Sequence, residues 1–206
     1  MANQIKSFTT QKKRLNHPSN KYNFNLQHTM TTKRTKEIQD IKEGLSSSQD
    51  VLINKALDKM ERKGDSTLLP DVIELWSLTD EQPIKKRAEA IMFGLKDKGA
   101  LKTLIDYLGT DASEDKKWFA ANAIWQSGFD ASAHLTELID FAITNSFTAA
   151  IDVMTIIENS EFNEEVEDTV DENIKRINRY IAQSKSENVS ILTEISSILI
   201  DKKIEG

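Results

Sequence analysis

The segment LLPDVIELW at residues 68–76 recurs twice further along the chain with the same apolar and acidic positions. The first counterpart is ALKTLIDYL at residues 100–108, 32 positions later, and the second is HLTELIDFA at residues 134–142, a further 34 positions on. Each copy contains a leucine, then an aliphatic pair, an acid and a large apolar residue. A period of about 30 to 40 residues is typical of stacked helix pairs, so the sequence predicts an all-α chain.

A predicted helix precedes each copy. Residues 50–62 place Val51, Ile53, Ala56, Leu57 and Met60 on one stripe, at the spacing of an amphipathic helix. The second such helix begins at residue 83. The third covers residues 113–127 and is followed by Gly128, a residue suited to a helix C-cap. We interpret each of these helices as the first member of a pair whose second member is the repeated segment.

The repeat becomes less regular after residue 142. Residues 147–157 have the pattern of a first helix, residues 163–181 that of its partner, and residues 187–200 that of a terminal helix. Residues 37–45 take the corresponding place at the other end. Terminal repeats are atypical because they cover an otherwise exposed core. The prediction is an α-α superhelix of about four helix pairs over residues 37–206.

The alanine-rich first helices and the Leu-x-x-Leu-Ile-Asp-aromatic second helices resemble HEAT repeats over about residues 47–182. The segment AIWQSGFD at residues 123–130, followed by IIEN at 156–159, is similar to a group of uncharacterised HEAT-like proteins of Bacteroidetes. We find no regular series of Arg or turn Asp of the kind that links neighbouring HEAT repeats. The resemblance implies protein–protein interaction as the commonest role of the fold.

Charge is unevenly distributed. Residues 1–36 contain eight basic residues and no acidic one, a charge of +8, whereas the remainder has 33 acidic and 19 basic residues, a charge of −14. We expect residues 1–36 to be a disordered basic segment. Three interpretations of residues 1–29 stay open: a basic binding arm, an organellar targeting peptide, or an upstream stretch that does not belong to the native protein. The acidic remainder should repel nucleic acid and anionic membranes and attract basic partners.

Composition also limits the chemistry. The absence of cysteine excludes disulfides, thiolate nucleophiles and thiolate metal sites. The sequence lacks a long apolar run and an export-type apolar region, so we expect a cytoplasmic protein without membrane contact. Phosphate-loop, His-Glu-x-x-His, Gly-x-Ser-x-Gly and kinase-type motifs are missing. We therefore expect no enzymatic activity, no cofactor and no metal, and interpret His134 as a surface or packing residue.

The candidate binding surface lies on the exposed side of the repeated helices. If the aliphatic residues face the core, five acids point outward: Asp71, Glu74, Asp106, Glu137 and Asp140. We call them the acidic row, and in HEAT proteins the corresponding helices line the concave face. Trp118 and Trp125, seven positions apart, are further candidates, either as an exposed interface pair or as packing between repeats.

Three functions remain open at this point. The first is a non-catalytic protein-binding scaffold or regulator that holds a basic partner on the acidic row. The second is a HEAT-like DNA glycosylase or another nucleic-acid-binding protein, against which the charge of −14 argues. The third is an inhibitor or immunity-type protein that covers a basic enzyme. The sequence predicts neither the identity of the partner nor the oligomeric state.

Overall fold

The computed structural model describes residues 33–205, and every regular element among them is a helix. The all-α prediction is therefore confirmed. The chain divides into two compact units, Met1–Glu37 and Ile38–Gly206. Most of the predicted disordered segment lies outside the described residues, so that prediction and the three interpretations of residues 1–29 stay open. Residues 33–36, which we assigned to that segment, are helical.

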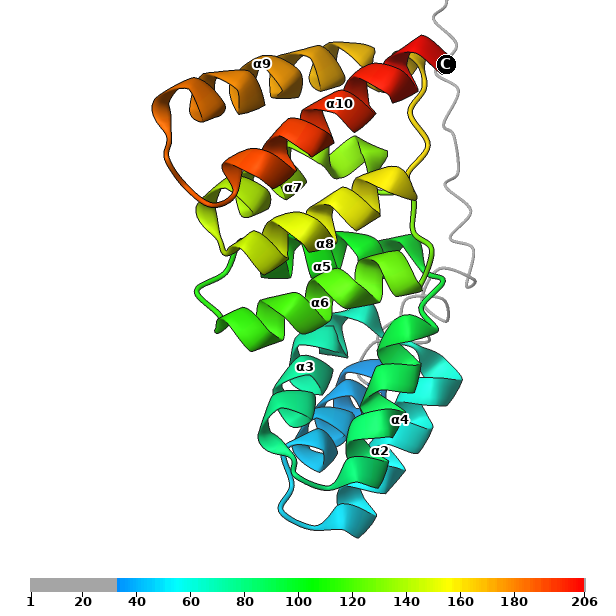
Figure 1. Ribbon diagram of the computed structural model, residues 1–206. Coiled ribbons are helices and arrows are strands. Elements are labelled where there is room, and N and C mark those ends of the chain that lie inside the picture. The colour runs from blue at the N-terminus through cyan, green and yellow to red at the C-terminus, as the bar shows by residue number, and fades with distance from the viewer. Residues whose placement is uncertain (1–32, 206) are drawn as a thin grey trace, which may run out of the picture. The chain divides into compact units, whose positions relative to one another are not determined.

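The second unit consists of helices joined by turns (Figure 1). It begins within a helix that ends at residue 45. The later α-helices are α2 (Asp50–Lys63), α3 (Leu69–Leu78), α4 (Gln82–Phe93), α5 (Lys98–Leu108), α6 (Glu114–Gln126), α7 (Leu135–Thr144), α8 (Phe147–Glu158), α9 (Glu167–Gln183) and α10 (Val189–Glu205). Short 3-10 helices precede α3, α7 and α9, namely η1 (Ser66–Leu68), η2 (Ser132–His134) and η3 (Glu164–Val166).

The predicted helices are confirmed, with shifts at some ends. The helix predicted for residues 163–181 starts as η3 and becomes α9 only at Glu167. Asn163 explains the delay, because its side chain accepts a hydrogen bond from the backbone N–H of Glu165 and caps the 3-10 turn. The terminal helix predicted for residues 187–200 spans Val189–Glu205.

The pairing of helices differs from our interpretation of the sequence. We had paired α2 with α3 and α8 with α9, whereas the structure packs α3 on α4, α5 on α6, α7 on α8 and α9 on α10. For α7 and α8, the length of the connection explains the difference. Only Asn145 and Ser146 join α7 to α8, and so short a link holds two helices side by side and antiparallel. The links from α6 to α7 and from α8 to α9 are longer and contain a 3-10 helix, which carries the chain to the next pair.

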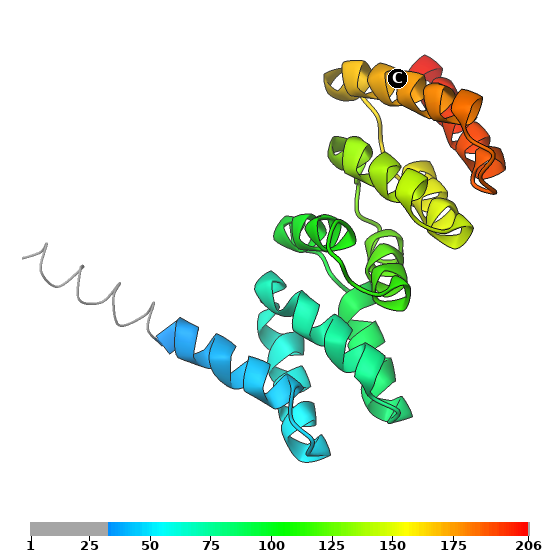
Figure 2. The same cartoon turned by 90° about the vertical axis from the view of Figure 1, so that its left-hand side faces the viewer.

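Alternate helices form two layers (Figures 1 and 2). In the first layer α3, α5, α7 and α9 contact one another in that order. In the second layer α2, α4, α6, α8 and α10 do the same. Ala88 and Ala121 are fully buried in the second layer, where their small side chains permit the helices to pack closely. Successive pairs therefore share one continuous core.

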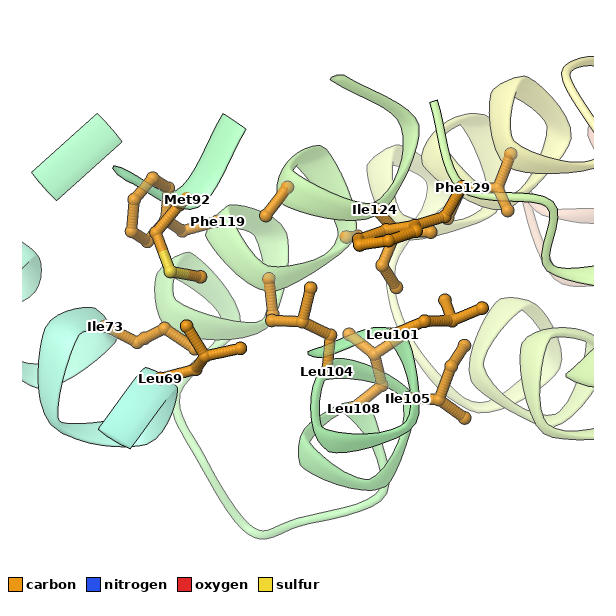
Figure 3. Close-up of a cluster of buried hydrophobic side chains, with 14 of the residues drawn as sticks. Leu69, Ile73, Met92, Leu101, Leu104, Ile105, Leu108, Phe119, Ile124 and Phe129 are labelled. Carbon is orange, nitrogen blue, oxygen red and sulfur yellow. The ribbon is translucent and has the colours of Figure 1, made fainter. Parts of the chain in front are cut away.

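The core joins both layers. Leu69 and Ile73 of α3, Met92 of α4, Leu104 of α5 and Phe119 of α6 are buried in one cluster (Figure 3). Burial of such side chains contributes about 1.5 to 3 kcal/mol each to the stability of the fold. This packing fixes the position of α6, which carries both candidate tryptophans.

Four turns at one edge of the stack carry the same hydrogen bond. Side-chain oxygens of Asp65, Asp97, Asp130 and Asn163 each accept from the backbone N–H two residues on. These positions are 32, 33 and 33 residues apart, so a regular series of turn Asp or Asn residues does exist. The prediction that no such series exists is therefore wrong. The series is hard to recognise in the sequence because the flanking residues differ and the last member is Asn. Asp130 also accepts from the N–H of Glu161, at 3.3 Å, and so links two successive turns.

Gly128 ends α6 as predicted. Its φ of 66° lies in the left-handed region that favours glycine. The N–H of Gly128 donates to the carbonyl of Trp125, and the N–H of Phe129 donates to the carbonyl of Ile124. These two bonds form a Schellman motif, and they turn the chain toward Asp130 and the following 3-10 helix.

Candidate functional site

The acidic row lies on the first layer. Asp71 and Glu74 belong to α3, Asp106 to α5, and Glu137 and Asp140 to α7. Four of these residues are exposed, and Asp71 is half-buried. The three helices contact one another in sequence, so the acids follow neighbouring elements of one layer. Their role in binding stays a prediction.

Each acid of the row lies close to a basic side chain. The pairs are Asp71 with Lys42 at 3.3 Å, Glu74 with Lys116, Asp106 with Lys102 at 2.8 Å, Glu137 with His134 at 3.6 Å, and Asp140 with Arg176. Three of the five pairs connect different helices, and the hydrogen bond to Glu74 raises the pKa of Lys116. The row is therefore a surface on which every acid lies beside a basic side chain, and the contact of Glu137 is an ion pair only when His134 is protonated. The sequence does not reveal these pairs, because the cross-helix partners are 29 to 42 residues apart.

The two candidate tryptophans have different environments. Trp118 is 39% exposed, and its ring centroid lies 6.0 Å from that of Trp76. Trp125 is half-buried, and its indole Nε1 is buried without a hydrogen-bond acceptor among the described residues. Trp118 thus presents an aromatic surface to solvent, whereas Trp125 packs against the core.

Trp118 lies against a fixed aromatic cluster. Trp76 is buried and stacks on Phe119 with 4.2 Å between ring centroids. Its indole Nε1 donates to a carboxylate oxygen of Glu89 at 3.0 Å, and the ammonium of Lys85 lies 4.5 Å from the ring centroid. These contacts hold the Trp76 ring in place, so Trp118 packs against a side chain of fixed position.

Asp152 of α8 is a buried acid that was not among the residues predicted from the sequence. Only 8% of it is exposed. Its Oδ1 accepts a long hydrogen bond, 3.4 Å, from Nδ2 of Asn122, while its Oδ2 is buried without a donor among the described residues. Burial raises the pKa of the Asp152 carboxyl to about 6, against the smaller opposite effect of Asn122. Buried carboxylates in which one oxygen lacks a hydrogen-bond donor are uncommon and mark candidate functional sites.

A pocket of about 250 Å³ connects Asp152 with Trp118. It lies between the first turns of α6 and α8 and the last turn of α7. Its charged and aromatic lining consists of Glu114, Asp115, Lys117, Trp118, Phe141 and Asp152. A hydrogen bond from Ser113 lowers the pKa of Asp115, so that carboxylate is ionised at neutral pH. Three carboxylates against one ammonium leave the pocket negative.

A larger cavity, of about 420 Å³, lies between the turns after α2 and α4. Its charged groups already have partners. Glu61 accepts from the guanidinium of Arg87, and Lys96 donates to the backbone carbonyl of Ser127 at 3.0 Å. These bonds tie neighbouring helices together, so the cavity walls are structural.

Residues 33–205 contain neither a metal-binding cluster nor a membrane-spanning helix. Within residues 33–205, no group of three or more His, Cys, Asp or Glu side chains has a metal-binding arrangement. In the same part of the chain, no helix combines the length and hydrophobicity that crossing a bilayer requires. His134, half-buried beside Glu137, is placed as a packing or surface residue would be.

Comparison with known proteins did not assign the chain. Family models, curated proteins and solved structures each gave no match. The resemblance to HEAT repeats therefore rests on the residues and on the helix arrangement described above.

Proposed function

We propose that this chain is a HEAT-like helical-repeat protein that binds a basic segment of a partner protein and catalyses no reaction. The observation that carries this proposal is the acidic row across α3, α5 and α7, four members of which are exposed. It lies in a body whose residues 37–206 carry a charge of −14.

The helical arrangement supports the HEAT-like part of the proposal. Equivalent helix pairs stack in two layers, and equivalent turn residues return every 32 or 33 positions. Repetition of one pair with a constant offset builds a superhelix. In the proposed superhelix the first layer lines the concave side and presents the acidic row to the partner.

The ion pairs within the row are compatible with binding. An exposed ion pair contributes only about 0 to 1 kcal/mol, so a lysine or arginine of a partner can replace an internal cation at little cost. Asp106 illustrates this, because its partner Lys102 lies on the same helix and both side chains are more than half exposed. A negative surface also accelerates the approach of a basic partner.

Charge favours a protein partner over nucleic acid. Phosphate groups are bound by lysine and arginine, whereas the second unit has an excess of acids. The test of this point is duplex DNA binding by the full-length chain in which all eight basic residues of residues 1–36 are changed to glutamine. Binding that persists and falls with salt would show that the helical body holds DNA, against the proposal.

The acidic row is tested by charge reversal. Proteins captured from cell extract by the wild-type chain are compared with those captured by Asp106→Lys/Asp140→Lys. We expect loss of partners that carry lysine- or arginine-rich segments. The control is Glu194→Lys/Asp201→Lys, which makes the same change in net charge on exposed positions of α10 in the second layer.

Circular dichroism establishes that both double variants are folded before capture is compared. Equal capture by the wild type and Asp106→Lys/Asp140→Lys contradicts the proposed role of the row. Equal loss in both double variants means that net charge alone attracts the partners, which also contradicts it.

A further inference from the structure

The pocket between α6 and α8 combines two features that a purely structural pocket does not need. Asp152 is one of the lining residues, and its Oδ2 is buried without a donor among the described residues. Trp118 lines it with an indole that is 39% exposed. The two residues come from different helix pairs, so the stacking of the pairs brings them together.

The charges that face Asp152 favour a cation. Glu114 and Asp115 of α6 lie on the same pocket as Asp152, and Lys117 is the one basic residue among the described residues that line it. An anion entering here would face three carboxylates. An ammonium group would instead supply the donor that Oδ2 lacks.

Trp118 adds an apolar surface for the rest of such a side chain. The pocket also has the ring of Phe141 and the methyl group of Ala149 in its lining. Long basic side chains bury their methylene stems on apolar surfaces while the charged end finds a polar partner, and indole faces attract cations. The walls therefore suit an alkyl ammonium better than an inorganic cation.

Geometry distinguishes lysine from arginine. Oδ1 of Asp152 is already engaged by Asn122, whereas Oδ2 is buried and has no donor among the described residues. A guanidinium binds best to both oxygens of a carboxylate at once, whereas an ammonium is a point donor. A single oxygen without a donor therefore fits a lysine ammonium better than a guanidinium.

We propose that this pocket receives a lysine side chain of the partner protein, with its ammonium on Asp152 and its stem along Trp118. This inference rests on the proposed function, since it names one residue that the basic segment must contain. The pocket lies at the edge where α7 turns into α8. None of the five acids of the acidic row lines it.

The experiment uses the full-length chain and a defined peptide. An acetylated, amidated hexapeptide of alternating lysine and glycine is titrated at constant ionic strength while the indole N–H signal of Trp118 is followed by NMR. The signal is assigned with Trp118→Phe. Matched peptides carry arginine or Nε-acetyl-lysine in place of lysine.

We expect a saturable shift with affinity in the order lysine, arginine, acetyl-lysine. Asp152→Asn should weaken lysine-peptide binding about tenfold or more, because a hydrogen bond to a charged group is lost. Asp201→Asn, which removes the same charge from an exposed position on α10, should bind as the wild type does. In the wild type, binding of the lysine peptide should also lower the pKa of Asp152, followed by carboxyl carbon NMR.

Three outcomes would overturn the inference: absence of a saturable shift, equal affinity of wild type and Asp152→Asn, or equal binding of lysine and acetyl-lysine peptides. If the inference fails while Asp106→Lys/Asp140→Lys still loses its partners, the proposed function stands and only the pocket assignment falls. If lysine binds the pocket while capture is independent of the acidic row, the proposed role of that row falls instead.

Discussion

Replacement of Asp152 by asparagine should stabilise the fold, and the gain should depend on pH. The pKa of the buried carboxyl is raised from 3.8 to about 6. Each unit of difference between folded and unfolded chains corresponds to about 1.36 kcal/mol, so ionised Asp152 lowers the free energy of unfolding by about 3 kcal/mol. Asparagine keeps a carbonyl acceptor for Asn122 and carries no charge.

The direction of the pH dependence follows from proton binding to Asp152 in the folded and unfolded chains. Between about pH 4 and about pH 6 the folded wild type binds a proton at Asp152 that the unfolded chain has already released. Asp152 therefore does not destabilise the folded wild type below about pH 4, and the free energy of unfolding decreases as the pH rises through about 6. The variant lacks this loss, so its advantage grows from about zero at pH 4 to about 3 kcal/mol above pH 7.

Urea denaturation of the wild type, Asp152→Asn and the exposed control Asp201→Asn measures this difference at several pH values. A variant no more stable than the wild type at neutral pH would refute the reasoning, because the carboxylate would then be solvated or paired. An advantage independent of pH would point to packing instead. A gain in stability together with a loss of lysine binding would identify Asp152 as a residue kept for binding at a cost in stability.

Three further substitutions test the fold. Phe119→Ala should lower the free energy of unfolding by about 3 to 5 kcal/mol in denaturant titration, because the ring is fully buried against Trp76; a loss below about 1 kcal/mol would contradict this packing. Gly128→Ala should lower the free energy of unfolding by about 1 to 2 kcal/mol, because Gly128 has a positive φ. The control Gly109→Ala, at a residue with φ −78°, should lower it less in the same titration. Equal effects of the two substitutions would argue against the Schellman turn. Asn188→Ala should lower the free energy of unfolding by about 1 to 3 kcal/mol, since the buried side-chain amide donates to two carbonyls at the end of α7. Hydrogen exchange of the backbone amides at the end of α7 should become faster in this variant. Unchanged protection of these amides would contradict a stabilising role of the two hydrogen bonds.

The sequence contains a signal that identifies Asp152 as a buried acid. On α8 this residue lies three positions after Ala149 and four before Ile156, both of which are buried. It therefore occupies the apolar stripe that helical spacing defines. Its partner Asn122 lies 30 residues earlier, at an interval close to that of the repeat. An acid on the core-facing stripe of a helix is a signal that periodicity alone can provide.

The acidic row shows the limit of the same reasoning. Helical spacing correctly predicted that Glu74, Asp106 and Asp140 are exposed. It could not show that Glu74 meets Lys116 or that Asp140 meets Arg176, because those contacts depend on how separate helices pack. The row therefore looked like an unpaired negative surface in the sequence and is a series of weak ion pairs in the structure.

The sequence by itself determined the helices and their period, because apolar spacing and capping residues act within a few positions of the chain. The segment at residues 68–76 and its two counterparts became α3, α5 and α7 with little change at their ends. Only the tertiary structure decided which neighbour each helix packs on, since that depends on the length and path of the connections. The same packing brings Trp118 of α6 beside Asp152 of α8, and a pocket formed by two helix pairs has no local signature in either.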